Sequence, residues 1–265
     1  MKIDFTGKTV VVTGGSAGIG LAAAKLFCEN GANVAICGRD TAKLEASVNE
    51  LKKAGGSVIG VPCDVTSRAQ LFALADKTVE AFGGIDVWVN NAGHNSMTRL
   101  MNVTEEYCDN QINLNFKSAL WGSQAAFKYM QEKGGAIVNA ASYAGIIPGV
   151  GMGMYGAAKT GVISLTRTLA SELAPYNIRV TAYAPGPVLT PLLEESLTGT
   201  PEQNEASLAR MASSLALQRV GEADEVANLI LYLASDYASF ITGTCVDVSG
   251  GKIATQAPAN AWAGR

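Results

Sequence analysis

Short apolar segments alternate with longer helical segments along most of the chain. The apolar segments carry Val, Ile and Ala with little interruption, which is typical of strands buried on both faces of a parallel sheet. The alternation predicts βαβ units. The predicted strands are residues 8–13, 33–37, 57–61, 86–89, 136–140 and 178–184, and the predicted helices are residues 18–30, 40–54, 66–82, 104–131, 155–174 and 223–235.

Because βαβ crossovers are right-handed, these elements predict an α/β fold with one doubly wound, Rossmann-type parallel β-sheet of about seven strands and helices on both faces. No repeat, linker or break in composition interrupts residues 1–265, so we expect a single domain. Residues 188–217 combine prolines, leucines and acids, and are predicted to form a lid at the ligand-binding edge of the sheet. The tail, residues 252–265, is expected to be extended, with Trp262 either a loose end or an anchor on another subunit.

Composition excludes several classes of protein. The 29 glycines among 265 residues follow no Gly-X-Y period, so they belong to particular turns. A net charge of −3, with no basic patch, predicts no nucleic-acid partner and no membrane partner. Five widely spaced cysteines and the absence of a signal-peptide pattern predict free thiols and a cytoplasmic location. With His94 as the single histidine, a multi-histidine metal site is impossible, and we expect no metal.

A glycine-rich turn, Thr13–Gly20 (TGGSAGIG), lies where the first predicted strand meets the first helix. Glycines there allow close approach of a pyrophosphate to the backbone, and the helix N-terminus offers N–H groups. The spacing is not the common G-x-G-x-x-G, so taken alone the turn is weak evidence, and a plain strand–helix connection is the alternative. The residues predicted to bind a dinucleotide here are Gly14, Ser16, Gly18, Ile19 and Gly20.

The residues at the end of the second predicted strand indicate which dinucleotide the protein binds. Many such folds place a carboxylate there for the ribose 2′-hydroxyl, but this chain has Gly38 followed by Arg39. A guanidinium without that acid favours a 2′-phosphate, so NADP(H) is the preferred cofactor and NAD(H) the alternative. The competing interpretation is that Arg39 is a solvated residue paired with a neighbouring acid. Asp40 can serve as the N-cap of the next helix.

Further motifs resemble the short-chain dehydrogenase/reductase family. They are Asn90-Asn91-Ala92-Gly93, Ser142, Tyr155-x-x-x-Lys159 and Pro185–Thr190, in order, and the resemblance extends from Gly7 to Gly251. It implies a single dinucleotide-binding catalytic domain that forms a homo-oligomer, commonly a homotetramer.

The resemblance also implies catalytic roles. Tyr155 would be the general acid/base, Lys159 would tune it and bind the nicotinamide ribose, and Ser142 would orient the substrate oxygen. Asn115 would hold a water that relays protons through Lys159, with the neighbouring Asn113 as the competing assignment. Independently, positions 155 and 159 share one helix face. An ammonium and an oxidised nicotinamide would both lower the pKa of the phenol, which is ordinarily near 10.

Additional contacts follow from the same resemblance. Asp64 and Val65 would lie near the adenine, Asn91 near the ribose, and Val188 and Thr190 near the nicotinamide carboxamide. Without the family pattern, Asp64 is equally an N-cap or strand-end acid. The substrate pocket is predicted to be mostly apolar. Its lining residues would be His94, Ser96, Met152, Met154, Leu192 and Leu193. For His94, a position in a surface loop away from the substrate is the competing interpretation.

Together these features predict an NADP(H)-dependent oxidoreductase that interconverts a ketone or aldehyde and a secondary or primary alcohol. Its substrate would be small and mostly uncharged. The alternatives are an NAD-dependent alcohol dehydrogenase of the same family and a non-catalytic NADP(H)-binding sensor. An intact Asn115, Ser142, Tyr155 and Lys159 disfavours the sensor.

Overall fold

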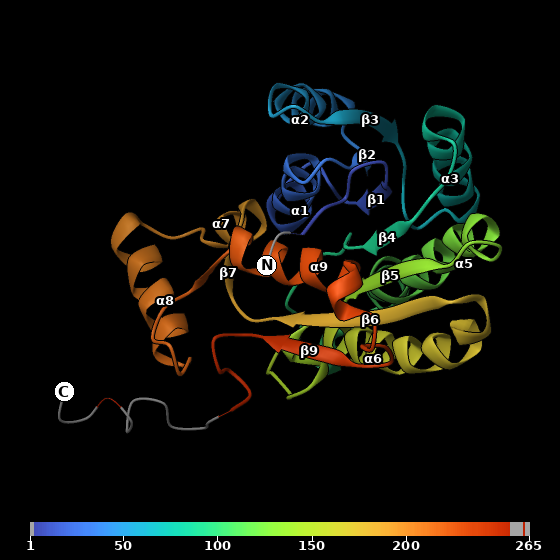
Figure 1. The fold of residues 1–265 in the computed structure, drawn as a ribbon. Helices are drawn as coiled ribbons and strands as arrows, with labels where there is room; N and C mark the ends of the chain where they lie inside the picture. Colours follow the sequence, from blue (N-terminus) through green and yellow to red (C-terminus); the bar gives the residue numbers. More distant parts are fainter. Residues whose placement is uncertain (1–2, 255–261, 263–265) are drawn as a thin grey trace.

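The computed structural model describes residues 3–254 and residue 262. Its central feature is a seven-stranded parallel sheet in the order β3-β2-β1-β4-β5-β6-β9 (Figure 1). The strands are β1 Thr9–Thr13, β2 Asn33–Gly38, β3 Ser57–Pro62, β4 Val87–Asn90, β5 Gly135–Ala140, β6 Ile178–Pro185 and β9 Cys245–Val248. The strand order reverses between β1 and β4, so the predicted doubly wound α/β fold is confirmed.

Helices cover both faces of the sheet. The main helices are α1 Gly18–Glu29, α2 Thr41–Lys53, α3 Arg68–Phe82, α4 Glu105–Ile112, α5 Ser118–Met130, α6 Gly153–Leu173 and α9 Ala223–Ala234. Short helical turns lie at Leu100–Asn102, Tyr143–Gly145, Ala174–Tyr176 and Asp236–Ala238. Along β1, Val10 and Val12 pack with α1, α2 and α9, while Val11 packs with α3 and α5 on the other face. This alternation explains why the three central positions of the strand are all apolar.

One predicted helix is interrupted. Residues 104–131 are predicted as one continuous helix, whereas the structure has α4, a π-helical turn at Asn113–Lys117, and then α5. The predicted long helix is therefore present from Glu105 to Met130, but the sequence did not predict the π-helical turn within it. A π-helical turn inserts a single extra residue into the helical register, and such turns occur often at functional sites. The turn buries the side chain of Asn115.

The predicted lid segment has its own secondary structure. It forms β7 Val188–Leu189, α7 Pro191–Ser196 and α8 Pro201–Ser213, and β7 pairs with β8 Gly221–Glu222. Helix α8 has no buried residue and projects from the body at the left of Figure 1. Most of the tail, for which an extended conformation is predicted, lies outside the described residues. Within it, the Trp262 indole N–H donates to the Ala216 carbonyl of the same chain at 2.9 Å.

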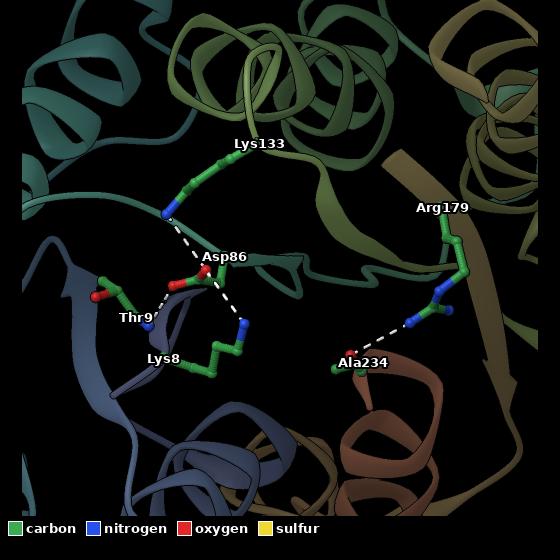
Figure 2. Close-up of polar contacts among 6 residues, drawn as sticks. All are labelled: Lys8, Thr9, Asp86, Lys133, Arg179 and Ala234. Carbon is green, nitrogen blue, oxygen red and sulfur yellow. Dashed lines mark hydrogen bonds and ion pairs between the residues drawn. The ribbon is translucent and has the colours of Figure 1, made fainter. Parts of the chain in front are cut away.

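The amino-terminal edge of the sheet carries a cluster of charged side chains (Figure 2). The Asp86 carboxylate accepts from the Thr9 N–H at 2.8 Å and from the Lys133 ammonium at 3.2 Å. The Lys8 ammonium lies 3.8 Å away. This cluster links the starts of β1 and β4 to the loop before β5.

Nearby, the Arg179 guanidinium closes the C-terminal end of α9. It donates to the carbonyls of Leu233 at 2.8 Å, Ser235 at 3.0 Å and Ile241 at 3.4 Å. It also donates to the carbonyl of Ala234 at 3.3 Å, the contact drawn in Figure 2. The last carbonyls of a helix have no partners within the helix and carry its negative dipole end. Arg179 therefore attaches α9 to β6.

Arg179→Met is expected to lower the free energy of unfolding by about 3 kcal/mol, because several partly buried carbonyls lose a charged donor. Denaturant titration followed by circular dichroism measures this change. The control is Arg210→Met on the exposed surface of α8, for which a change below about 0.5 kcal/mol is expected. Equal midpoints for the two variants would show that Arg179 does not hold α9.

Candidate active site

The carboxyl ends of β1, β2, β4, β5 and β6 border a cleft of about 770 Å³. The cleft brings together many residues predicted from the sequence. Those that line it are Gly14, Ser16, Gly18, Ile19, Arg39, Asp64, Val65, Asn91, His94, Tyr155, Lys159, Thr190 and Leu192. A second cavity, of about 480 Å³, lies at the opposite edge, where Asp86 and Arg179 are already bonded within the chain.

The glycine-rich turn leaves a helix N-terminus open to the cleft. Gly18 has φ +51°, a conformation that side-chain-bearing residues rarely adopt. A methyl group at Gly20 would overlap the carbonyl oxygen of Gly14, so the turn packs tightly on α1. Ala17, at the N-cap, provides no side-chain cap, and no acid lies in the first turn. The amides and dipole of α1 therefore fit an anionic group such as a pyrophosphate.

The cleft is basic beyond β2. A Cβ added to Gly38 would lie 2.8 Å from the Ser16 hydroxyl oxygen, so a carboxylate there has no room unless Ser16 moves. The Asp40 carboxylate accepts from the Lys43 N–H at 3.0 Å and caps α2, as the sequence suggested. Within the described part of the chain Arg39 has no ion-pair partner, which argues against the alternative of pairing with a neighbouring acid.

Lys43 is a cleft residue that sequence reasoning missed. Its exposed side chain starts from the first turn of α2, close to Arg39 in sequence. The available signal was its position three residues after the Asp40 cap. Together, Ser16, Arg39 and Lys43 fit a phosphate on the adenosine ribose.

Two of the predicted cofactor residues also make bonds within the chain. The Asn91 amide donates to the Thr13 carbonyl at 3.0 Å and accepts from the Tyr183 hydroxyl at 2.9 Å, so it joins β4 to the glycine-rich turn and to β6. The Asp64 carboxylate accepts from the N–H of Thr66 at 2.9 Å and from its hydroxyl at 2.8 Å. Asp64 therefore has the strand-end structural role as well as a place in the cleft.

Tyr155 and Lys159 meet at the centre of the cleft. The Lys159 ammonium is 5.7 Å from the centroid of the Tyr155 ring and donates to the Ala140 carbonyl at 2.8 Å. Lys159 is only 3% exposed, and burial lowers its pKa to about 8. Ser142 is buried beside them, and its hydroxyl accepts from the Ala144 N–H at 3.1 Å.

The pKa of Tyr155 departs from expectation. Burial raises it to about 12, and the Ser142 hydroxyl acts in the opposite direction. The sequence predicted a lowered pKa, with a positively charged nicotinamide as one of two causes. The chain's own groups alone do not produce that lowering, because burial outweighs them. Near pH 7 the phenol is therefore a proton donor.

Asn115 reaches the same region from the π-helical turn. Its amide donates to the His94 carbonyl at 2.9 Å, and its oxygen accepts from the His94 N–H at 3.1 Å. A Cβ at Gly93 would lie 2.8 Å from that oxygen and 3.3 Å from the Lys159 ammonium, so both groups border the same small volume. Asn113 is only partly buried and has no such contacts, so the geometry favours Asn115.

Some other predicted site residues lie outside the cleft lining, among them Gly20 and Val188. Thr190 does line the cleft, and its hydroxyl also caps α7 by accepting from the Leu193 N–H at 3.4 Å. Of the predicted substrate residues, His94 and Leu192 line the cleft; Ser96, Met152, Met154 and Leu193 do not. The Met152 sulfur instead accepts from the Tyr143 hydroxyl at 3.6 Å. Glu195 also lines the cleft, and no sequence motif predicted this.

A doubly wound sheet with a Tyr–Lys pair at its carboxyl edge is the arrangement of an oxidoreductase. The comparisons specify the family: residues 14–252 match the family model described as enoyl-(acyl carrier protein) reductase. The chain belongs to the short-chain dehydrogenase/reductase family.

Several relatives cover almost the whole chain. The 3-oxoacyl-(acyl-carrier-protein) reductase FabG of Thermotoga maritima is 39% identical, covering 93% of this chain and 98% of the relative. The 4-formylbenzenesulfonate dehydrogenase of Comamonas testosteroni is 35% identical, over 94% and 99%. A solved short-chain type dehydrogenase/reductase from Mycobacterium marinum superposes with TM-score 0.88 at 32% identity, over 95% and 98%.

Among the described residues, no cluster of three or more His, Cys, Asp or Glu could hold a metal ion. In the same part of the chain, no helix is long and apolar enough to cross a membrane.

Proposed function

We propose that this protein is an NADP(H)-dependent oxidoreductase that interconverts a ketone or aldehyde and the corresponding alcohol. The observation that carries the proposal is the pairing of Tyr155 with the buried Lys159 in a cleft that also contains the open N-terminus of α1. One relative is named as a reductase and another as a dehydrogenase, which supports the same reaction class.

In this proposal the bound nicotinamide supplies or accepts the hydride. Tyr155 donates its phenolic proton to the carbonyl oxygen during reduction, as its raised pKa permits near pH 7. The Ser142 hydroxyl lies beside Tyr155 and orients the same oxygen. Lys159, when protonated, stabilises the phenolate that remains. Asn115, on the other side of Gly93, borders the route by which a proton returns to Lys159.

The proposed substrate is small and mostly uncharged. The relatives named above carry different substrates in their names, so they support the reaction class and leave the substrate open. A panel of ketones, aldehydes and alcohols, assayed by nicotinamide absorbance with NADPH, NADH and both oxidised forms, tests the proposal. Tight NADPH binding without turnover of any member would favour a non-catalytic sensor.

Cofactor preference is tested by Arg39→Ala. We expect the dissociation constant of NADPH to rise at least tenfold while that of NADH changes less than about twofold, since only NADPH carries the 2′-phosphate. Titration calorimetry measures both constants. Lys43→Ala should act in the same direction with a smaller effect, and Lys53→Ala, on the last turn of α2, is the control. Equal losses for NADPH and NADH would favour the NAD-dependent alternative.

A homotetramer is proposed from the family resemblance alone, and a cytoplasmic location from the cysteine pattern and the absence of a signal-peptide pattern. They stay predictions.

A further inference from the structure

Three side chains on one side of α4 and the π-helical turn hold the loop that follows β4. Tyr107, Gln111 and Asn115 are spaced four residues apart, so they project from neighbouring positions along the helix. Their polar atoms contact residues 94–96 or one another. We call Tyr107, Gln111 and Asn115 the α4 latch, and residues 94–96 the rim.

The α4 latch forms hydrogen bonds with both ends of the rim, Ser96 and His94. The Tyr107 hydroxyl donates to the Ser96 carbonyl. The Gln111 amide donates to the Ser96 hydroxyl oxygen at 3.1 Å. At the other end, Asn115 bonds both the N–H and the carbonyl of His94. His94 and Tyr155 line the same cleft, so the α4 latch determines the position of one part of the cleft wall.

Gln111 connects the two ends. Its Nε2 is used by Ser96, and its Oε1 accepts from the Asn115 amide at 3.0 Å. This contact fixes the orientation of the Asn115 side-chain amide, so that its oxygen faces the His94 N–H. Gln111 is 4% exposed and Asn115 1% exposed, so water cannot replace a lost partner easily.

The rim itself is not in a conformation that satisfies all of its polar atoms. The Asn95 side-chain oxygen is buried and lacks a hydrogen-bond partner among the residues that the structure describes. Buried polar atoms without partners are rare and destabilising, so they persist where surrounding contacts determine the conformation. The latch supplies those contacts. The α4 latch thus keeps the rim in a conformation that costs local stability, and such conformations are typical of functional loops.

We propose that Gln111 is a positioning residue that, through Asn115 and Ser96, sets the rim beside Tyr155 and thereby determines affinity for the carbonyl substrate. This inference rests on the proposed oxidoreductase function. It adds a residue that no sequence motif indicated and whose side chain does not line the cleft.

Gln111→Met keeps the length of the side chain and removes both hydrogen bonds. We expect KM for the best carbonyl substrate to rise about tenfold, with kcat and the NADPH dissociation constant within about twofold. Gln111→Glu keeps the acceptor for the Asn115 amide and replaces the donor to Ser96 with an oxygen to which the Ser96 hydroxyl can itself donate, so it should restore KM at pH 8. Asn110→Ala, on the exposed side of α4, is the matched control and should resemble the wild type.

Ser96→Ala provides a second route to the same loss and leaves Gln111 in place. It should raise KM as Gln111→Met does, and the double variant should be no worse than either single variant. An unchanged KM in Gln111→Met, or additive effects in the double variant, would overturn the role of Gln111.

Amide hydrogen exchange at His94, measured without substrate, keeps this test separate from the proposed function. Faster exchange in Gln111→Met than in Asn110→Ala is expected, and equal exchange would count against the latch. A wild-type protein that turns over no carbonyl or alcohol would instead overturn the proposed function.

Discussion

Tyr155→Phe is expected to lower kcat for carbonyl reduction about 1000-fold or more while the dissociation constant of NADPH stays within about threefold. The variant removes the phenolic proton donor and keeps the ring, and general acid catalysis contributes typically 10²–10⁴-fold. Steady-state turnover followed at the nicotinamide absorbance, together with fluorescence titration of NADPH, measures both quantities.

Tyr143→Phe is the matched control for that experiment. Tyr143 is also partly buried near Tyr155, but its hydroxyl donates to the Met152 sulfur. Its loss is expected to change kcat less than about threefold. Normal turnover by Tyr155→Phe would refute the proposed acid/base role, and loss of NADPH binding would show that the residue acts mainly in cofactor binding.

Lys159→Met is expected to remove activity and yet to stabilise the protein at pH 7. Burial lowers the pKa of Lys159 to about 8 from an ordinary value of 10.5. This shift corresponds to about 3 kcal/mol of destabilisation when the ammonium is charged. Leaving the Ala140 carbonyl without its donor offsets about 1 kcal/mol. The expected net gain is about 2 kcal/mol in the free energy of unfolding.

The pH dependence of that gain has a definite sign. Between pH 8 and 10.5 the unfolded wild type binds more protons at this lysine than the folded wild type does, so its stability rises with pH. The advantage of Lys159→Met should therefore be full below pH 8 and shrink as pH rises to about 9.5. Burial also shifts the thiol pKa values of Cys28 and Cys245, but equally in both proteins, so the difference between them isolates Lys159. A variant less stable than the wild type at pH 7 would contradict this account.

The centre of the sheet could be predicted because β1, β4 and β5 are short, mostly apolar and buried on both faces. The edge strand β9 is only partly buried and was not among the predicted strand ranges. The site motifs could be predicted because they depend on local spacing: the glycines of the turn, and Tyr155 and Lys159 four residues apart. What could not be predicted depends on tertiary contacts. The rise in the Tyr155 pKa comes from burial by other elements, and the π-helical turn that buries Asn115 carries no sequence motif used in the prediction.

The substrate pocket was the least predictable part. Met154 adjoins Tyr155 on α6, where adjacent positions point about 100° apart. Met152 lies just before α6 begins, and its sulfur contacts the Tyr143 hydroxyl. Gln111 and Lys43 have no motif at all. Their positions become meaningful only when the loop after β4 and the end of β2 are seen in space.

The charged cluster at the amino-terminal edge of the sheet has an evolutionary consequence. Asp86 and Arg179 fasten strands and helix at one end of the molecule, while the residues that meet the dinucleotide and the substrate lie at the other. Substitutions at the carboxyl edge therefore leave the contacts of Asp86 and Arg179 intact. Substitutions among the cleft residues are therefore expected to alter substrate choice without removing the contacts of Asp86 and Arg179 that hold the opposite end of the sheet.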